Sequence, residues 1–353
     1  MIVLDLELKN FRNIENIFIN PCENMNVICG ENAQGKTNLI EAIWLFTGAK
    51  SFRGAKDQEF LKFGTQKAIC NLNFKSKGII NKASLQIESK KVAFLNENKL
   101  KSSSALAGNF NSIVFSPIDL NIVSEGPKLR RKFIDSAICQ IYPSYIKILK
   151  QYIRAVTQRN QIIKDFKYDS TVSVMLDVFE SEITTLGKKI TDMRKRYLEL
   201  LSEFLPNLYD GISKGKEILE INYISSNKED LEEALKNSRK EDMFSGVTSV
   251  GPHRDDIDFK INGISARSFG SQGQKRSVAL AVKLSEAEVI NKKTGEYPVI
   301  LLDDVMSELD ESRQNFVLNH IEGMQSFLTC CDPRNIENLN SGKIFNIKNG
   351  GVF

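Results

Sequence analysis

Gly30-Glu31-Asn32-Ala33-Gln34-Gly35-Lys36-Thr37 is the stretch of sequence that decides the fold. It matches Gly-x4-Gly-Lys-Ser/Thr, the pattern of a phosphate-binding loop. Glycines let the backbone curl so that successive N–H groups point at phosphate oxygens. Lys36 is then expected to contact the β- and γ-phosphates and to assist catalysis, while the Thr37 hydroxyl ligates Mg²⁺. Residues 30 to 37 are therefore the candidate ATP-binding segment, and a chance glycine-rich turn is the alternative.

The segments on either side of this loop favour the phosphate-binding interpretation. Met25 to Cys29 is a short, mostly apolar run that ends at a glycine, as a buried strand feeding a loop does. Thr37 to Phe46 has apolar residues at helical spacing. The N-terminal end of such a helix is positive and attracts phosphate.

A second motif supplies acidic side chains. Val299 to Leu302 is apolar, and Asp303 and Asp304 follow it directly. A buried strand that ends in a carboxylate positions the magnesium ion in P-loop enzymes, so Asp303 is the predicted Mg²⁺-side residue. Asp304 is the candidate catalytic residue that polarises the attacking water. A strand followed by an ordinary acidic turn is the alternative, and only the pairing with the phosphate loop makes the motif strong.

A third motif, Ser271-Gln272-Gly273-Gln274, precedes a helical pattern that runs to about Ile290. Backbone N–H groups, a serine hydroxyl and the helix dipole can together bind an anion at such a place. A plain serine N-cap is the alternative. Because the motif lies shortly before the Asp303-Asp304 strand, we interpret it as the signature loop of an ABC-type ATPase. Ser307-Glu308-Leu309-Asp310 then stands where that class has its D-loop.

The pattern of apolar residues divides the chain into two lobes. Strand-like alternation dominates the first 115 residues, and helical patterning runs from Pro127 to about Leu205, where Pro206 and Gly211 are expected to end it. We therefore predict an α/β protein with a mixed-sheet ATPase lobe at 1–116 and 246–353 and a helical lobe at 117–245. The helical lobe is too short for a long coiled coil.

Composition limits the classes of function. The 353 residues carry a net charge of +4, which permits nucleic-acid binding without arguing for it. No apolar run approaches the ~20 residues of a membrane-spanning helix, and no signal-peptide pattern is visible, so we expect a cytoplasmic protein with no membrane contact. The cysteines lack C-x-x-C spacing, which favours reduced thiols over a metal site or disulfides; they are Cys22, Cys29, Cys70, Cys139, Cys330 and Cys331.

Several segments, in the same order along the whole chain, resemble the RecF family of bacterial recombination-mediator ATPases. Besides the three motifs above, they are Lys9-Asn10-Phe11-Arg12-Asn13, Lys50-Ser51-Phe52-Arg53, Ser116-Pro117, Asp119-Leu120, Arg130-Arg131, Phe133-Ile134-Asp135 and Gly251-Pro252-His253-Arg254-Asp255-Asp256.

The resemblance implies an ATPase head like that of SMC proteins, without their coiled coil. It implies ATP and Mg²⁺ as cofactors and a homodimer that forms on ATP, in which Ser271 and Gly273 of one subunit cap the γ-phosphate bound by the other. It also places Arg12 near the nucleotide, with Arg53 as a further candidate. Asp304 is one methylene shorter than the glutamate of fast ABC ATPases, so we expect weak, slow hydrolysis that acts as a timer.

The resemblance further implies binding to duplex DNA and to single/double-strand junctions at gaps, in DNA replication, recombinational repair and the SOS response. RecO and RecR are the implied partners, and loading of the strand-exchange protein is the implied task. The predicted DNA contacts are a basic cluster on a helix, although such a cluster can also be a simple solvated face: Lys188, Lys189, Arg194, Lys195 and Arg196.

Two other functions remain open from the sequence. The chain could be the nucleotide-binding subunit of an ABC transporter, although the long insertion between loop and signature and the Asp303-Asp304 pair argue against this. It could also be an ATP-gated adaptor that never contacts DNA. Stimulation of ATP hydrolysis by DNA would separate a repair ATPase from both.

Overall fold

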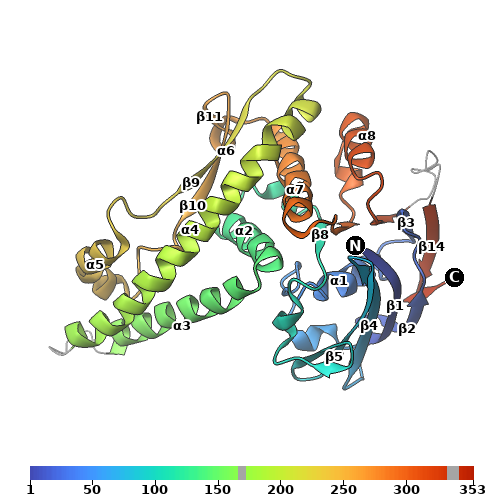
Figure 1. The fold of residues 1–353 in the computed structure, drawn as a ribbon, viewed down its shortest axis with the longest axis horizontal. Coiled ribbons are helices and arrows are strands. Elements are labelled where there is room, and N and C mark those ends of the chain that lie inside the picture. The colour runs from blue at the N-terminus through green and yellow to red at the C-terminus, as the bar shows by residue number, and fades with distance from the viewer. Residues whose placement is uncertain (166–171, 332–341) are drawn as a thin grey trace. The chain divides into compact units, whose positions relative to one another are not determined.

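The computed structural model describes residues 1–165, 172–331 and 342–353. The chain forms two compact units (Figure 1). Unit 1 comprises residues 1–121, 211–214 and 279–353, and unit 2 comprises residues 122–210 and 215–278. Both chain ends belong to unit 1, so its elements are drawn in blue and in red in Figure 1.

A mainly parallel sheet forms the centre of unit 1. Its strand order is β15-β14-β3-β13-β12-β8, and only the pairing of β14 with β15 is antiparallel. Buried apolar strands of this kind are typical of parallel sheets covered on both faces. The strands are β3 (Met25–Cys29), β8 (Ser112–Phe115), β12 (Val299–Leu302), β13 (Ser326–Cys330), β14 (Gly342–Lys348) and β15 (Gly351–Val352).

An antiparallel sheet completes unit 1, in the order β2-β1-β4-β5-β6-β7. Helix α1 (Lys36–Leu45) contributes Leu39, Ile40 and Ile43 to one apolar core that also contains residues of both sheets. The helix therefore joins the two sheets into one body. The strands are β1 (Ile2–Phe11), β2 (Ile14–Ile19), β4 (Ala68–Ser76), β5 (Ile79–Ile87), β6 (Lys91–Leu95) and β7 (Asn98–Lys99).

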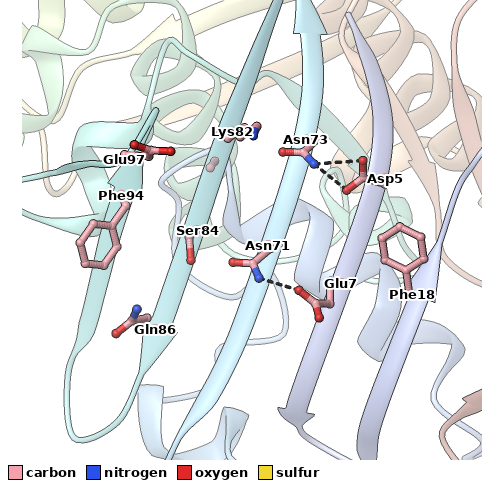
Figure 2. A pocket seen from close by; sticks show the side chains of 11 residues that line it. Asp5, Glu7, Phe18, Asn71, Asn73, Lys82, Ser84, Gln86, Phe94 and Glu97 are labelled. Atoms are coloured by element: carbon pink, nitrogen blue, oxygen red, sulfur yellow. Dashed lines mark hydrogen bonds between the residues drawn. The ribbon is translucent and has the colours of Figure 1, made fainter.

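The face of the antiparallel sheet drawn in Figure 2 is mainly polar, and it also carries two phenylalanine rings. Asn73 donates a hydrogen bond to Asp5 at 2.9 Å, and Asn71 donates one to Glu7 at 2.8 Å. These side chains line a shallow pocket of about 430 Å³. The pocket contains no residue of the 30–37 loop and is lined by carboxylates, so it does not suit a triphosphate.

Unit 2 is mainly helical. Its sheet has the order β11-β10-β9 and is antiparallel. The helices are α2 (Pro127–Ile141), α3 (Ser144–Asp165), α4 (Val172–Ser213), α5 (Leu231–Ser245) and α6 (Ala266–Phe269), and the strands are β9 (Leu219–Ile224), β10 (Asp256–Ile261) and β11 (Ile264–Ser265). The α/β architecture with a helical second unit confirms the predicted fold class.

The predicted lobe boundary at residue 245 is displaced. Strand β10 pairs with β9 from Asp256 opposite Ile224 to Ile261 opposite Leu219, so residues 246–278 belong to unit 2 and not to the ATPase lobe. Helix α7 (Gln272–Thr294) begins in unit 2 and ends in unit 1. The helix α8 (Glu311–His320) follows in unit 1, with Asp310 capping its first turn by accepting from the Arg313 N–H at 3.0 Å.

The predicted end of the helical run near Leu205 is wrong, because α4 continues through Pro206 and Gly211 to Ser213. Proline lacks an N–H and normally breaks a helix. Here the apolar residues Leu205, Leu208 and Tyr209 are buried on both sides of the proline, and this packing outweighs the local preference. At Gly211 a Cβ would meet the Phe316 ring at 2.4 Å, so the glycine allows close packing.

Within the described residues, no helix combines the length and the apolar character needed to cross a lipid bilayer.

Candidate nucleotide-binding site

The 30–37 loop connects β3 to α1 through backbone conformations that few residues adopt. Ala33 has φ 64° and Gly35 has φ 116°, and both angles lie in the left-handed region. A Cβ on Gly35 would lie 2.9 Å from the Asn13 side chain, and a Cβ on Gly30 would lie 2.3 Å from the carbonyl oxygen of Ile347. Gly30 is therefore required by the space beside a backbone oxygen, and Gly35 is required by its dihedral angle.

Lys36 opens α1 and is 6% exposed. Its ammonium donates to the carbonyl oxygens of Gly30 at 2.6 Å and Glu31 at 3.0 Å, and it lies 3.5 Å from the Cys331 sulfur. The Lys36 side chain therefore reaches back to the first residues of the 30–37 loop. An ammonium group at this position can form an ion pair with phosphate oxygens bound by the loop.

Thr37 and Asp303 bring two oxygen ligands together at the end of β12. The Thr37 hydroxyl donates to Asp303 Oδ1 at 2.9 Å, and the Thr329 hydroxyl donates to the same oxygen at 3.3 Å. Burial raises the pKa of Asp303, and the Thr37 hydrogen bond acts in the opposite direction. Mg²⁺ in nucleotide sites takes one or two protein oxygens and completes its shell with water and phosphate. The donor set of Thr37 and Asp303 fits that ion.

Asp304 differs sharply from its neighbour. Strand β12 ends at Leu302, and Asp304 has φ 55°, so the two aspartates lie beyond the regular pleat of the strand. The Asp304 N–H donates to the Thr329 hydroxyl at 2.8 Å, while its side chain is exposed. Aspartate and asparagine are among the residues that tolerate a positive φ best. The arrangement provides one buried and one exposed carboxylate at the same strand end.

A buried carboxylate, Glu41, organises the basic residues near the loop, and the sequence interpretation overlooked it. Arg12 donates two hydrogen bonds to Glu41 Oε2, at 2.9 and 2.7 Å, and the Ser51 hydroxyl donates to the other oxygen. Arg53 lies 3.9 Å from Glu41 and donates to Asn38 at 3.1 Å. The signal in the sequence was a single acidic residue within the apolar stretch that follows Asn38. Arg12 is therefore bound to a protein carboxylate, and its contact with a nucleotide stays a prediction.

The signature segment lies in unit 2, at the start of α7. Ser271 and Gln274 cap the helix reciprocally, because the Ser271 N–H donates to Gln274 Oε1 at 2.7 Å and the Gln274 N–H donates to the Ser271 hydroxyl at 3.2 Å. Ser271 and Gln272 are exposed, and Gly273 and Gln274 are half-buried. Ser271 is thus an N-cap of α7, as the alternative interpretation expected. The N-terminus of α7 is nevertheless exposed.

The basic cluster on α4 is split between solvent and interior. Lys188, Lys189, Lys195 and Arg196 are exposed. Arg194 is 2% exposed and donates to both oxygens of Asp135, at 2.9 and 2.8 Å, as well as to the Pro252 carbonyl.

The predicted DNA contact of Arg194 is therefore wrong, because its side chain is buried and its N–H groups donate to acceptors within unit 2. Arg130 on α2 is likewise buried, and it is paired with Asp256 at 2.7 Å.

Comparisons with known proteins agree with this geometry. The family model described as RecF/RecN/SMC N terminal domain matches residues 2–349. The DNA replication and repair protein RecF of Clostridium acetobutylicum is 41% identical over 100% of this chain and 99% of its own length. The protein of the same name from Lachnospira eligens is 37% identical with the same coverage. A solved structure of the recombination mediator protein RecF-ATP in the RecFOR pathway superimposes with a TM-score of 0.91 at 37% identity, over 100% of this chain and 97% of that one.

Proposed function

This chain belongs to the RecF family of DNA replication and repair proteins, and from that premise we propose that it is an ATP-dependent DNA-binding protein that dimerises on ATP and separates after slow hydrolysis. The observation that carries the proposal is the hydrogen bond from Thr37, the last residue of the phosphate-binding loop, to Asp303. It joins the loop to the end of β12, although the two segments are far apart in sequence. A related structure described as RecF-ATP supports adenine nucleotide as the ligand.

In this proposal one subunit holds the triphosphate on residues 30–37, with Mg²⁺ between its phosphates and the oxygens of Thr37 and Asp303. The start of α7 in a second subunit covers the nucleotide. Ser271, which is exposed, supplies a hydroxyl, and Gly273 supplies a backbone N–H close to it. A helix N-terminus with such groups can bind a γ-phosphate. ATP then acts as the link between two copies of the chain.

Hydrolysis of the bound ATP lets the two subunits separate. Asp304 is exposed at the same strand end as Asp303, where a carboxylate can orient and polarise a water molecule. Because an aspartate reaches less far than a glutamate, we expect turnover to be slow. The enzyme is in this view a weak ATPase whose hydrolysis step limits how long the dimer lasts.

The task of the dimer is the recognition of duplex DNA and of junctions at single-stranded gaps, in the cytoplasm. The names of the relatives support replication and repair as the setting. We extend this to RecO and RecR as partners, to loading of the strand-exchange protein and to the SOS response. The exposed Lys188, Lys189, Lys195 and Arg196 are the proposed contacts to phosphates, with little sequence preference and a steep dependence on salt.

ATP hydrolysis in the presence of DNA tests the proposal. Steady-state phosphate release is measured with no DNA, with single strands, with duplex and with a gapped duplex. We expect gapped or duplex DNA to raise the rate at least threefold, and the Lys36→Met variant to show no activity under any condition. A wild-type rate that no DNA changes would instead favour an ABC transporter subunit or an adaptor that does not contact DNA.

A further inference from the structure

Three of the six cysteines converge beside the phosphate loop. Cys29 and Cys330 are opposite one another at the ends of the paired strands β3 and β13, and their sulfur atoms lie 2.8 Å apart across 301 residues of sequence. Cys331 comes next in the chain. Its sulfur lies 3.5 Å from the Lys36 ammonium and donates to the Asn32 side chain at 3.1 Å.

The three thiols differ in accessibility. Cys29 is buried, Cys330 is half-buried and Cys331 is exposed. Burial and the contact with Cys29 raise the pKa of the Cys330 thiol, which makes that thiol a poor first target for an oxidant in solution. Oxidation by a peroxide in solution requires an accessible thiol, and Cys331 is the exposed thiol of the three. Cys331 is therefore the entry point to the cluster.

We propose that Cys331, Cys330 and Cys29 form an oxidation site, through which a hydroperoxide closes a disulfide between Cys29 and Cys330 and weakens nucleotide binding. The consequence for nucleotide rests on the proposed function, whereas the disulfide itself does not.

The reaction balances in three steps. The Cys331 thiol attacks one oxygen of hydrogen peroxide, the O–O bond breaks, and a sulfenic acid and one water are formed. The Cys330 thiol then attacks the Cys331 sulfur, a bond forms between the sulfurs of these two consecutive residues, and a second water leaves. Finally Cys29 attacks Cys330 and releases Cys331 as a thiol. The sum is two thiols and one peroxide giving one disulfide and two waters.

The phosphate loop is attached directly to this thiol pair. Gly30 follows Cys29, and its N–H donates to the Cys330 carbonyl at 3.3 Å while its own carbonyl accepts from Lys36. Bonded sulfurs lie about 2.0 Å apart, so closing the bond draws the two strand ends together. Gly30 has no free space on the side of Ile347. The displacement is therefore transmitted to the loop and to the partners of Lys36.

The experiment treats the full-length reduced protein with hydrogen peroxide and follows disulfide-linked peptides by mass spectrometry without reductant. We expect a Cys29–Cys330 linkage in the wild type, no such linkage in Cys29→Ser, and formation at least tenfold slower in Cys331→Ser. The matched control is Cys22→Ser, which removes a half-buried thiol of unit 1 outside the cluster and should behave as the wild type. Oxidation confined to Cys331, or equal rates in wild type and Cys331→Ser, would overturn the proposed site.

Titration with a fluorescent ATP analogue measures the consequence. Affinity should fall at least tenfold in the oxidised wild type, return with dithiothreitol, and stay unchanged in peroxide-treated Cys29→Ser. A complete disulfide with unchanged affinity would contradict the regulatory effect. If the reduced wild type binds no nucleotide at all, the proposed function fails, while the linked peptides still decide whether the thiols react.

Discussion

At the residue scale, the nucleotide site is built from backbone positions that accept very few side chains. The Ile347 carbonyl excludes a Cβ at Gly30, and a φ of 116° disfavours one at Gly35. Asp304 has a positive φ, which allows one carboxylate to turn to solvent while Asp303 stays buried. These residues determine where the polar atoms of the site can lie.

A substitution of Gly30 tests this constraint. In Gly30→Ala the new methyl group would lie 2.3 Å from a backbone oxygen, so the loop must shift. We expect a loss of stability of about 1–3 kcal/mol, as for other overpacked sites, and an ATP affinity at least tenfold weaker. Urea denaturation and nucleotide titration measure the two effects. Gly126→Ala is the control, because its Cβ would meet open space, and equal behaviour of the two variants would refute the steric explanation.

At the scale of elements, helix α4 presents one face to solvent and buries the other, which is mostly apolar but includes an ion-paired arginine. Lys189 and Arg196 are exposed, whereas Arg194 is held by Asp135 and by the Pro252 carbonyl. Residues 188–196 contain five basic side chains, and their spacing alone does not indicate which of them is buried. The partner, Asp135 on α2, could be identified only from the folded structure.

Replacing the buried arginine should therefore affect folding and not DNA directly. Arg194→Met leaves the Asp135 carboxylate without its ion pair, and removal of one partner of a buried pair costs about 3–5 kcal/mol. Chemical denaturation should show a loss of about that size for Arg194→Met and almost none for Lys189→Met, whose side chain is exposed. An Arg194→Met variant that is as stable as the wild type but does not bind DNA would contradict this expectation and indicate that Arg194 contacts DNA.

The sequence predicted the strongly periodic elements well. The apolar runs before the phosphate loop and before Asp303 are the strands β3 and β12, and the helix after the loop is α1. The end of α4 was wrong because Pro206 and Gly211 are local stop signals that burial of their neighbours overrides. The boundary at residue 245 was wrong for a similar reason, since the pairing of β10 with β9 is not visible in either segment alone.

At the scale of the whole molecule, the order of motifs predicted the class of protein, but contacts between distant segments needed the structure. Thr37 and Asp303 were both expected beside one Mg²⁺ ion, and the structure joins them by a hydrogen bond that the sequence did not predict. The ion pair of Arg12 with Glu41 and the contact of Cys29 with Cys330 belong to no motif. Both arise from strand and helix packing that single-sequence patterns do not encode.

The central claim is that ATP joins two copies of this chain, and sedimentation velocity with saturating ATP and Mg²⁺ tests it most directly. The informative variant is Asp304→Asn, because asparagine tolerates the positive φ at this position and retains the shape of the side chain while removing the proposed catalytic carboxylate. We expect Asp304→Asn to accumulate as a dimer with ATP and Lys36→Met to stay monomeric. A monomeric Asp304→Asn protein under these conditions, or a Lys36→Met protein that still dimerises on ATP, would contradict the account.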